Sequence, residues 1–229
     1  MKTIGFIGVY DKIDLLLNIA KILTTMKKKV LVIDSTMHQK AKYVVPAINP
    51  TISYITYFED IDVAIGFNNM EQIKKYAGTS DLPYDYLLVD ADNEERINEF
   101  QLEVADKNYF VTSFDIYSMK KGIELFNNVR VPFTLTKLLY SKEILKEDDD
   151  YLNYISLGHK MVWEEEKIYF PIENGDLLAI HENQRVQKIK FRRLSIEYKD
   201  ALNMVTQQIL NEKNDSNVRR AIKLIEKGV

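Results

Sequence analysis

The chain has 229 residues, of which 46% are hydrophobic and 28% are charged, and its formal net charge at pH 7 is −3. This is enough apolar material for one large core. The small net charge excludes a whole-molecule field that would drive the chain onto nucleic acid or an anionic membrane. The sequence has no cysteine, which excludes disulfides and thiolate metal sites, and its three histidines lack metal-ligand spacing. No apolar run approaches the ~20 residues that span a bilayer, and we expect a cytoplasmic protein.

The N-terminal part of the sequence alternates short apolar runs with amphipathic stretches. Residues 2–8 form an apolar run, residues 12–26 carry apolar side chains at helical spacing, and residues 30–33 form a second apolar run. Two further units repeat this pattern, with apolar runs at 86–89 and 109–112 and a helix-like stretch at 117–127. Strands that alternate with helices predict an α/β fold with a mostly parallel central sheet and helices on both faces.

The C-terminal half continues the pattern less regularly. Residues 131–139 and 167–170 are predicted strands, and the acidic stretch at 147–150 between them is predicted to be a solvated loop. Residues 191–210 predict a long amphipathic helix. We therefore expect one domain over residues 1–210, followed over 211–229 by a linker and a short amphipathic helix.

The loop after the first strand is where an α/β fold places its ligand crevice. A working phosphate-binding loop needs glycines that let backbone N–H groups surround the phosphates, a lysine that reaches them, and a Ser or Thr hydroxyl that binds magnesium. Here the segment reads Ile7-Gly8-Val9-Tyr10-Asp11-Lys12-Ile13-Asp14. It keeps one glycine and the lysine, and it has neither the other glycines nor the hydroxyl.

This loop resembles the deviant Walker A motif of the MinD/ParA ATPases, including their CpaE/TadZ branch, which reads K-G-G-x-G-K-T-T before a helix with an N-L-A core. The Asn18-Ile19-Ala20 segment fits that helix and sets the register. Gly8 then matches the first glycine and Lys12 the invariant lysine. The departures are Ile7 for the signature lysine that reaches the dimer partner's nucleotide, Val9 and Asp11 for two glycines, Ile13 for the magnesium-binding Thr, and Asp14 for the next Thr.

Three later segments extend the resemblance in the family's order. Residues 30–34 are similar to its second strand, which ends in a carboxylate at Asp34, and residues 84–90 are similar to Walker B, with Asp90 as the magnesium-linked aspartate. Residues 169–173 are similar to the adenine-side segment with its proline, Pro171. The resemblance thus implies a P-loop NTPase-like three-layer sandwich with a vestigial nucleotide site at Gly8, Lys12, Asp34, Asp90 and Pro171.

The altered loop changes the chemistry that this site can support. A carboxylate at Asp11 or Asp14 repels a triphosphate, and Ile13 provides no magnesium ligand. ATP hydrolysis is therefore not expected, and we expect no cofactor and no metal, with ATP and magnesium as the alternative. In the other interpretation of the surviving residues, Lys12 simply pairs with Asp34 or Asp90 at the mouth of an empty site.

Two surface segments are candidates for partner contacts. Residues 218–229 have an apolar face and a basic face, and several MinD-like proteins use such a helix as a reversible membrane anchor; packing on the domain or docking of a protein are the alternatives. A basic stretch precedes the long helix, and the resemblance to ParA implies that it could contact DNA phosphates. Its residues are Arg185, Lys188, Lys190, Arg192 and Arg193.

The sequence as a whole favours a non-catalytic, pseudo-ATPase scaffold. The resemblance implies that it helps to position or assemble a membrane-associated machine, such as a pilus, secretion or conjugation apparatus, with peripheral contact to the inner face of the membrane. The alternatives are an ATP-binding switch and a DNA-binding partition accessory protein. The oligomeric state stays open, because Ile7 disfavours the family's nucleotide-sandwich dimer while a nucleotide-independent dimer remains available.

Overall fold

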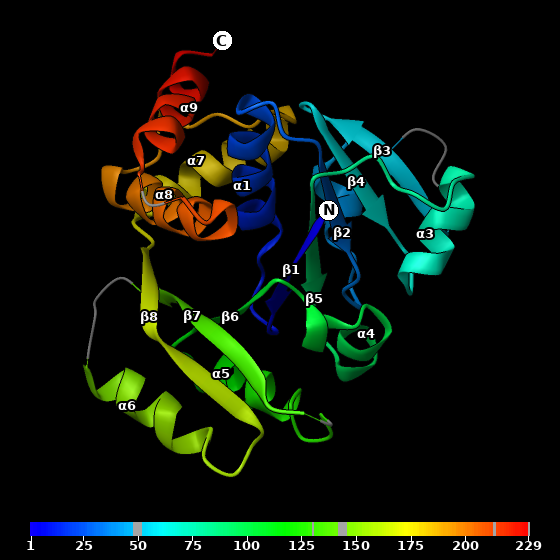
Figure 1. The fold of residues 1–229 in the computed structure, drawn as a ribbon. Helices are drawn as coiled ribbons and strands as arrows, with labels where there is room; N and C mark the ends of the chain where they lie inside the picture. Colours follow the sequence, from blue (N-terminus) through cyan, green and yellow to red (C-terminus); the bar gives the residue numbers. More distant parts are fainter. Residues whose placement is uncertain (48–51, 130, 142–145, 213, 229) are drawn as a thin grey trace.

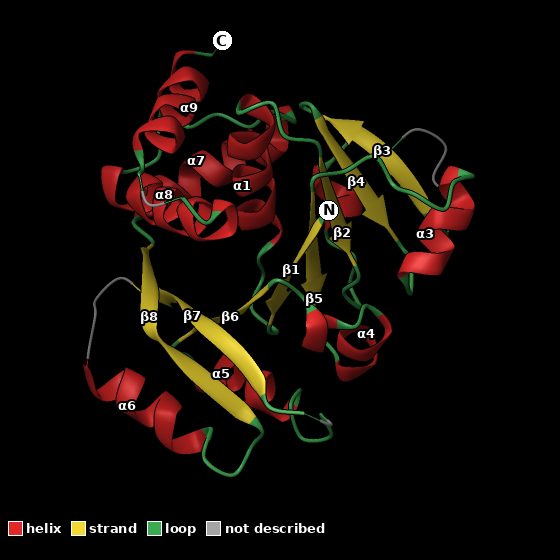
Figure 2. Ribbon diagram, viewed as in Figure 1, coloured by secondary structure: helices red, strands yellow, loops and turns green. Residues whose placement is uncertain are grey.

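A computed structural model describes residues 1–47, 52–129, 131–141, 146–212 and 214–228, with the side chains of residues 146–148 excepted. In this part of the chain, strands and helices alternate along most of the sequence (Figures 1 and 2). The strands are β1 (Lys2–Ile7), β2 (Val30–Asp34), β3 (Tyr54–Phe58), β4 (Ile61–Ile65), β5 (Tyr86–Ala91), β6 (Lys107–Ser113), β7 (Phe133–Ser141) and β8 (Met161–Pro171). The helices are α1 (Ile13–Thr25), α2 (Ala41–Val44), α3 (Met70–Ala77), α4 (Glu94–Glu99), α5 (Ile116–Glu124), α6 (Lys146–Ile155), α7 (Asn174–Val186), α8 (Ile196–Leu210) and α9 (Ser216–Lys227).

The described strands form one sheet in the order β3-β4-β2-β5-β1-β6-β7-β8. Every neighbouring pair is parallel except β3 and β4, which are antiparallel. The central strands are buried on both faces, which explains why their sequences read as continuous apolar runs. The predicted α/β fold with a mostly parallel sheet is confirmed.

Helices cover both faces of the sheet and complete three layers. One apolar cluster joins the sheet to α1, α2, α7, α8 and α9, and a second joins it to α3, α4, α5 and α6. Successive residues of β2 alternate between the two, since Val30 and Val32 belong to the first cluster and Leu31 and Ile33 to the second. The three-layer arrangement places the loop between β1 and α1 at the carboxyl end of the central strands.

The β3–β4 hairpin was not among the predicted elements. Its turn consists of Glu59 and Asp60, which both have positive φ, at 53° and 67°. A two-residue turn of this kind normally uses Asn-Gly or Asp-Gly, because those residues tolerate positive φ best. The usual sequence signal of a hairpin is therefore missing here.

The acidic stretch at 147–150 is a second difference from the sequence prediction. It lies in α6, and the Asp149 side chain is buried instead of solvated. Asp149 accepts hydrogen bonds from Lys137 on β7 and Lys167 on β8, each at 2.6 Å. Two lysines from neighbouring strands thus compensate a carboxylate whose burial would otherwise be unfavourable.

The C-terminal helix α9 packs back on the domain. Its apolar residues Val218, Ala221, Ile222 and Ile225 are buried in the cluster that also contains α1 and α8. Lys199 of α8 also donates a 2.5 Å hydrogen bond to Glu226. This is the packing alternative for residues 218–229, and the division of the chain at residue 210 stays a prediction. Among the described residues, no helix is long and apolar enough to cross a membrane.

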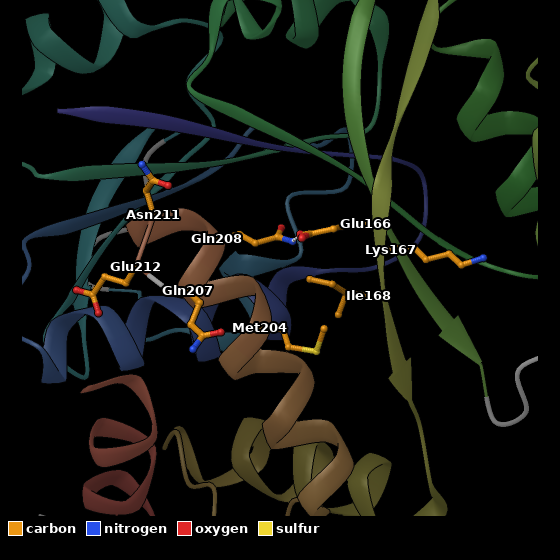
Figure 3. A pocket seen from close by; sticks show the side chains of 8 residues that line it. All are labelled: Glu166, Lys167, Ile168, Met204, Gln207, Gln208, Asn211 and Glu212. Carbon is orange, nitrogen blue, oxygen red and sulfur yellow. Dashed lines mark hydrogen bonds between the residues drawn. The ribbon is translucent and has the colours of Figure 1, made fainter. Parts of the chain in front are cut away.

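A groove of about 430 Å³ lies at the β8 end of the sheet, between this strand and α8 (Figure 3). Its apolar floor contains Ile168 and Met204. This groove is separate from the loop between β1 and α1, and its chemistry is considered below.

Candidate functional site

The sheet topology brings together the polar residues that the sequence places far apart. Strands β2 and β5 are parallel neighbours with Asp34 directly opposite Asp90, and β5 is also paired with β1, which leads into Gly8. The loop from Gly8 to Lys12 then enters α1. Four of the five predicted site residues, Gly8, Lys12, Asp34 and Asp90, therefore lie at one end of the central strands.

Lys12 is buried and directs its ammonium group into the protein. Its Nζ lies 2.6 Å from Asp90 Oδ1 and donates a 2.7 Å hydrogen bond to the carbonyl oxygen of Gly8 and a longer one, 3.4 Å, to that of Tyr10. The side chain is 1% exposed. An ammonium group has three N–H donors; here two of them have carbonyl acceptors, and the charge is paired with Asp90.

Asp90 is held in an environment that disfavours its charge. Complete burial raises the pKa of its carboxyl group to about 7, the nearby Asp34 adds to the rise, and Lys12 opposes it. Asp34 is satisfied by other donors, because its carboxylate accepts hydrogen bonds from the backbone N–H groups of Thr36 and Ala41 and from the Thr36 hydroxyl. Both carboxylates are thus engaged within the protein.

Gly8 has a structural reason to be glycine. Its φ is +147°, and a Cβ atom at this position would lie 2.2 Å from the carbonyl oxygen of Val111 on β6. Such a distance is far inside van der Waals contact, so any side chain would push β1 and β6 apart. The close packing of these strands accounts for this glycine without a phosphate.

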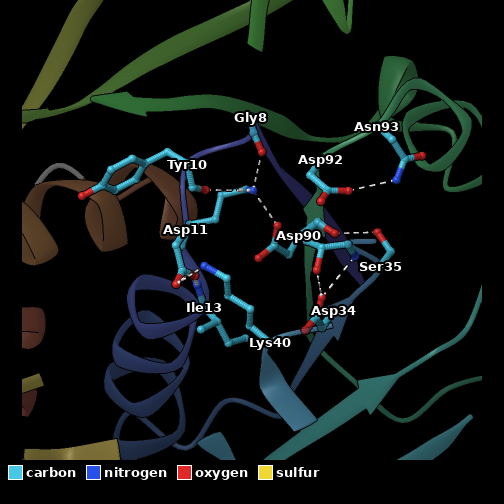
Figure 4. Close-up of polar contacts among 12 residues, drawn as sticks. Gly8, Tyr10, Asp11, Ile13, Asp34, Ser35, Lys40, Asp90, Asp92 and Asn93 are labelled. Carbon is cyan, nitrogen blue, oxygen red and sulfur yellow. Dashed lines mark hydrogen bonds and ion pairs between the residues drawn. The ribbon is translucent and has the colours of Figure 1, made fainter. Parts of the chain in front are cut away.

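The rest of the loop does not form the glycine nest of a phosphate-binding loop. Val9, Tyr10 and Asp11 are not among the residues with positive φ, whereas a nest requires alternation between right- and left-handed conformations. Instead, Asp11 Oδ1 accepts a 3.3 Å hydrogen bond from the backbone N–H of Ile13, and Oδ2 accepts one from Lys40 at 2.8 Å. Figure 4 shows Lys40 reaching across to Asp11. A carboxylate of the chain itself therefore lies at the N-terminus of α1, the place where this fold could present N–H groups to an anion.

Of the two residues that replace threonines, Ile13 is buried and Asp14 is partly buried. Ile13 is 1% exposed and packs in the main core. Asp14 accepts a 2.7 Å hydrogen bond from Gln184 Nε2 of α7, which ties the first turn of α1 to that helix. Burial raises the pKa of Asp14 to about 7, with a further contribution from Asp11. Neither side chain provides a hydroxyl for a magnesium ion.

The cavity beside the loop is small for a nucleotide. It has a volume of about 70 Å³, whereas pockets for drug-sized ligands are roughly 300–1,000 Å³. Its wall combines Asp11, Asp34, Asp90 and Asp92 with Lys12 and Lys40, and both lysines are already paired with carboxylates. Within the described ranges, no group of three or more His, Asp or Glu side chains could hold a metal ion. The residues present do not fit a magnesium–triphosphate complex in this arrangement.

Pro171 is not brought into this cluster. It ends β8, and two strands, β6 and β7, separate β8 from β1. The ring of Tyr10 points instead toward β7 and stacks on Tyr140 with the centroids 4.8 Å apart, and Tyr140 stacks on Phe170 at 5.1 Å. The sequence analysis assigned no role to Tyr10, and its partner could not be found by local pattern because the contact depends on the order of the strands.

The basic stretch lies at the end of α7 and in the segment that leads to α8. Lys188 pairs with Glu59 at 3.1 Å, and Arg193 pairs with Glu182. Lys190, Arg192 and Arg193 line a cavity of about 230 Å³. In the described part of the chain, Arg185, Lys190 and Arg192 have no carboxylate within ion-pair distance, so three of the five cations are unpaired.

The comparisons with known proteins identify the fold. No family model matches the chain, and no curated relative does either. Among solved structures, the cell division ATPase MinD from Pyrococcus furiosus is 14% identical, with a TM-score of 0.60 over 92% of this chain and 98% of that one. MinD in the MinC:MinD complex of Aquifex aeolicus is 16% identical, with a TM-score of 0.57 over 93% and 98%. The pNOB8 ParA bound to nonspecific DNA is 13% identical, with a TM-score of 0.54 over 93% and 99%. The chain therefore has the fold of the MinD/ParA P-loop ATPases.

Proposed function

We propose that this protein is a pseudo-ATPase scaffold that keeps the MinD/ParA fold and does not use nucleotide. The observation that carries the proposal is the environment of Lys12. A lysine that binds a nucleotide must direct its ammonium group toward the phosphates. Here the Lys12 ammonium group instead pairs with Asp90 and donates hydrogen bonds to two backbone carbonyl groups. Asp11 similarly lies at the N-terminus of α1, where an anion would otherwise bind.

The role of such a scaffold would lie in its protein contacts. One structural neighbour is a complex between MinD and a second protein, MinC, and this fold therefore offers precedent for partner binding. We propose that the chain helps to position or assemble a membrane-associated machine of the pilus, secretion or conjugation type, as a member of the CpaE/TadZ-like branch. Contact with the membrane through α9 would require its apolar face to leave the domain, since Val218 and Ile222 are buried there.

ATP hydrolysis by the purified protein is the first test. At about 1 mM ATP, within the usual range of KM values, we expect phosphate release no faster than in a buffer control. A variant that restores the motif, Val9→Gly/Asp11→Gly/Ile13→Thr, removes the carboxylate at α1 and supplies the missing hydroxyl. The variant should bind nucleotide more tightly than the native chain. Magnesium-dependent turnover by the native chain would overturn the proposal and favour the ATP-dependent switch.

A second candidate function is that of a DNA-binding partition accessory protein. It is favoured by the basic cavity with Lys190, Arg192 and Arg193 and by the structural neighbour bound to nonspecific DNA. Phosphate contacts by these side chains would make binding fall steeply with salt. Binding of random-sequence duplex DNA that is lost in Arg192→Ala/Arg193→Ala and retained in Arg219→Ala/Arg220→Ala would support this candidate over the scaffold.

A further inference from the structure

The groove between β8 and α8 lies beside an open edge of the sheet. β8 is the last strand, and among the described residues no strand pairs with its outer side. An edge strand of this kind exposes backbone N–H and C=O groups that another chain can pair with. The adjacent groove of about 430 Å³ is large enough for a long side chain. Backbone pairing sites and a side-chain pocket are therefore next to each other.

The groove combines an apolar floor with an acidic rim. Ile168 and Met204 contribute the apolar surface. Met204 is 47% exposed, so a ligand can reach it. Glu166 and Glu212 provide carboxylates. Gln208 donates a 2.6 Å hydrogen bond to Glu166 and accepts one from Tyr109 at 3.1 Å, which holds the Glu166 carboxylate in place. In Figure 3, Glu166 and Gln208 lie side by side in this way.

The acidic charge of the groove is not neutralised by a described residue. Lys167 is the one cation among the groove residues, and its side chain points away in Figure 3 and pairs with Asp149 at 2.6 Å. Neither Glu166 nor Glu212 has a Lys, Arg or His within ion-pair distance in the described ranges. Glu165, the preceding residue of β8, is also exposed, and no described cation lies within ion-pair distance of it. The surface is thus complementary to a positively charged ligand.

We propose that this edge binds an extended, positively charged segment of a protein partner by strand addition. Backbone groups of the segment pair with the outer edge of β8, and alternate side chains project to the same face of the sheet as Glu166 and Ile168. A Lys or Arg at one such position lays its aliphatic stem over Met204 and Ile168, with its charge facing Glu166, and Glu212 adds negative charge at the far end of the groove. A second copy of β8 is a poor occupant, because Glu165 and Glu166 of the two copies would bring like charges together.

The proposal goes beyond the scaffold function and does not depend on the nucleotide site. The test is selection of random dodecapeptides on the immobilised full-length chain, followed by synthesis of the enriched peptides. We expect peptides with Lys or Arg at alternate positions between β-branched residues. Hydrogen exchange should show that the bound peptide protects backbone amides within residues 161–171.

Variants then separate the groove from general charge effects. The double variant Glu166→Gln/Glu212→Gln should bind the selected peptide with about tenfold lower affinity, and this binding should depend less on salt concentration. The matched control Glu103→Gln/Glu197→Gln removes the same charge from exposed positions outside the groove and should leave the affinity unchanged. The proposal is overturned by an absence of enrichment, by protection of other segments, or by equal affinity for both double variants. The proposal is also overturned if the chain forms a dimer whose β8 amides are protected from hydrogen exchange in the absence of peptide.

Discussion

The loop between β1 and α1 and the groove between β8 and α8 treat their charged groups in opposite ways. At the loop, Lys12 is buried on Asp90 and Lys40 is paired with Asp11. At the groove of about 430 Å³, Glu166 and Glu212 are lining residues that have no cation within ion-pair distance among the described residues. The position where this fold could hold a nucleotide is thus satisfied by the chain itself, and an unrelated surface carries the uncompensated charge. The groove between β8 and α8 is therefore the better place to look for a charged ligand.

The largest expected effect comes from breaking the buried pair at the loop. Lys12→Met leaves Asp90 buried without its cation and removes the contribution that keeps its pKa from rising above about 7, and at pH 8 the free energy of unfolding should fall by about 3–5 kcal/mol. Urea unfolding measures this loss. The double variant Lys12→Met/Asp90→Leu removes both charges and should recover most of it. A loss below about 1 kcal/mol in the single variant would show that the pair is not internal to the fold.

Gly8 gives the next largest effect. Gly8→Ala places a Cβ 2.2 Å from the carbonyl oxygen of Val111 at a φ of +147°, and should destabilise the protein by about 3 kcal/mol in thermal or urea unfolding. Gly78→Ala is the matched control, because Gly78 also has positive φ, at +67°, and has open space around it. It should cost about 1 kcal/mol. Equal costs at the two sites would remove the packing explanation for Gly8.

The partly buried Asp14, in the first turn of α1, predicts a pH-dependent effect on stability. Its pKa is raised to about 7, so between its ordinary pKa and about pH 7 the folded state binds more protons than the unfolded state, and stability decreases as pH rises. Asp14→Asn cannot ionise and still accepts a hydrogen bond from Gln184. At pH 8 it should be more stable than the native chain by about 1–3 kcal/mol, with a smaller gain at pH 5 and little difference below about pH 4. Destabilisation by the same amount at both pH values would contradict this assignment.

The smallest effect is expected at the surface of the loop. The Lys40 and Asp11 side chains are 51% and 42% exposed, and an ion pair so accessible to water contributes less than about 1 kcal/mol. Lys40→Met should therefore change the urea midpoint only slightly, and less still at high salt. If Lys40→Met lowered the free energy of unfolding as much as Lys12→Met, the Lys40–Asp11 pair could not be as accessible to water as described.

The central strands were predictable because their signal is local. Parallel strands that are buried on both faces, such as β2 and β5, read as continuous apolar runs that end in Asp34 and Asp90. The β3–β4 hairpin was missed because Glu59 and Asp60 replace the usual turn residues. Helix α6 was missed because Asp149 is compensated by Lys137 and Lys167, which lie 12 and 18 residues away in the sequence.

The site was predicted in part for similar reasons. Residues at the ends of strands gather once the strand order is known, and the pairing of Lys12 with Asp90 was one of two stated interpretations. The hydrogen bond from the Ile13 N–H to Asp11 and the stacking of Tyr10 on Tyr140 depend on side-chain directions that no spacing rule supplies. Pro171 was grouped with the site by resemblance, and the strand order separates it from Gly8.

Calorimetric titration of the full chain with ATP and magnesium, with ADP as a parallel titration, tests the central claim most directly. If Lys12 is committed to Asp90 and the N-terminus of α1 to Asp11, no binding heat should appear up to about 1 mM nucleotide, a concentration that corresponds to about −4 kcal/mol of binding free energy. Saturable binding at micromolar nucleotide would contradict the account. It would show that these contacts open for a ligand and that the protein is a nucleotide-dependent switch.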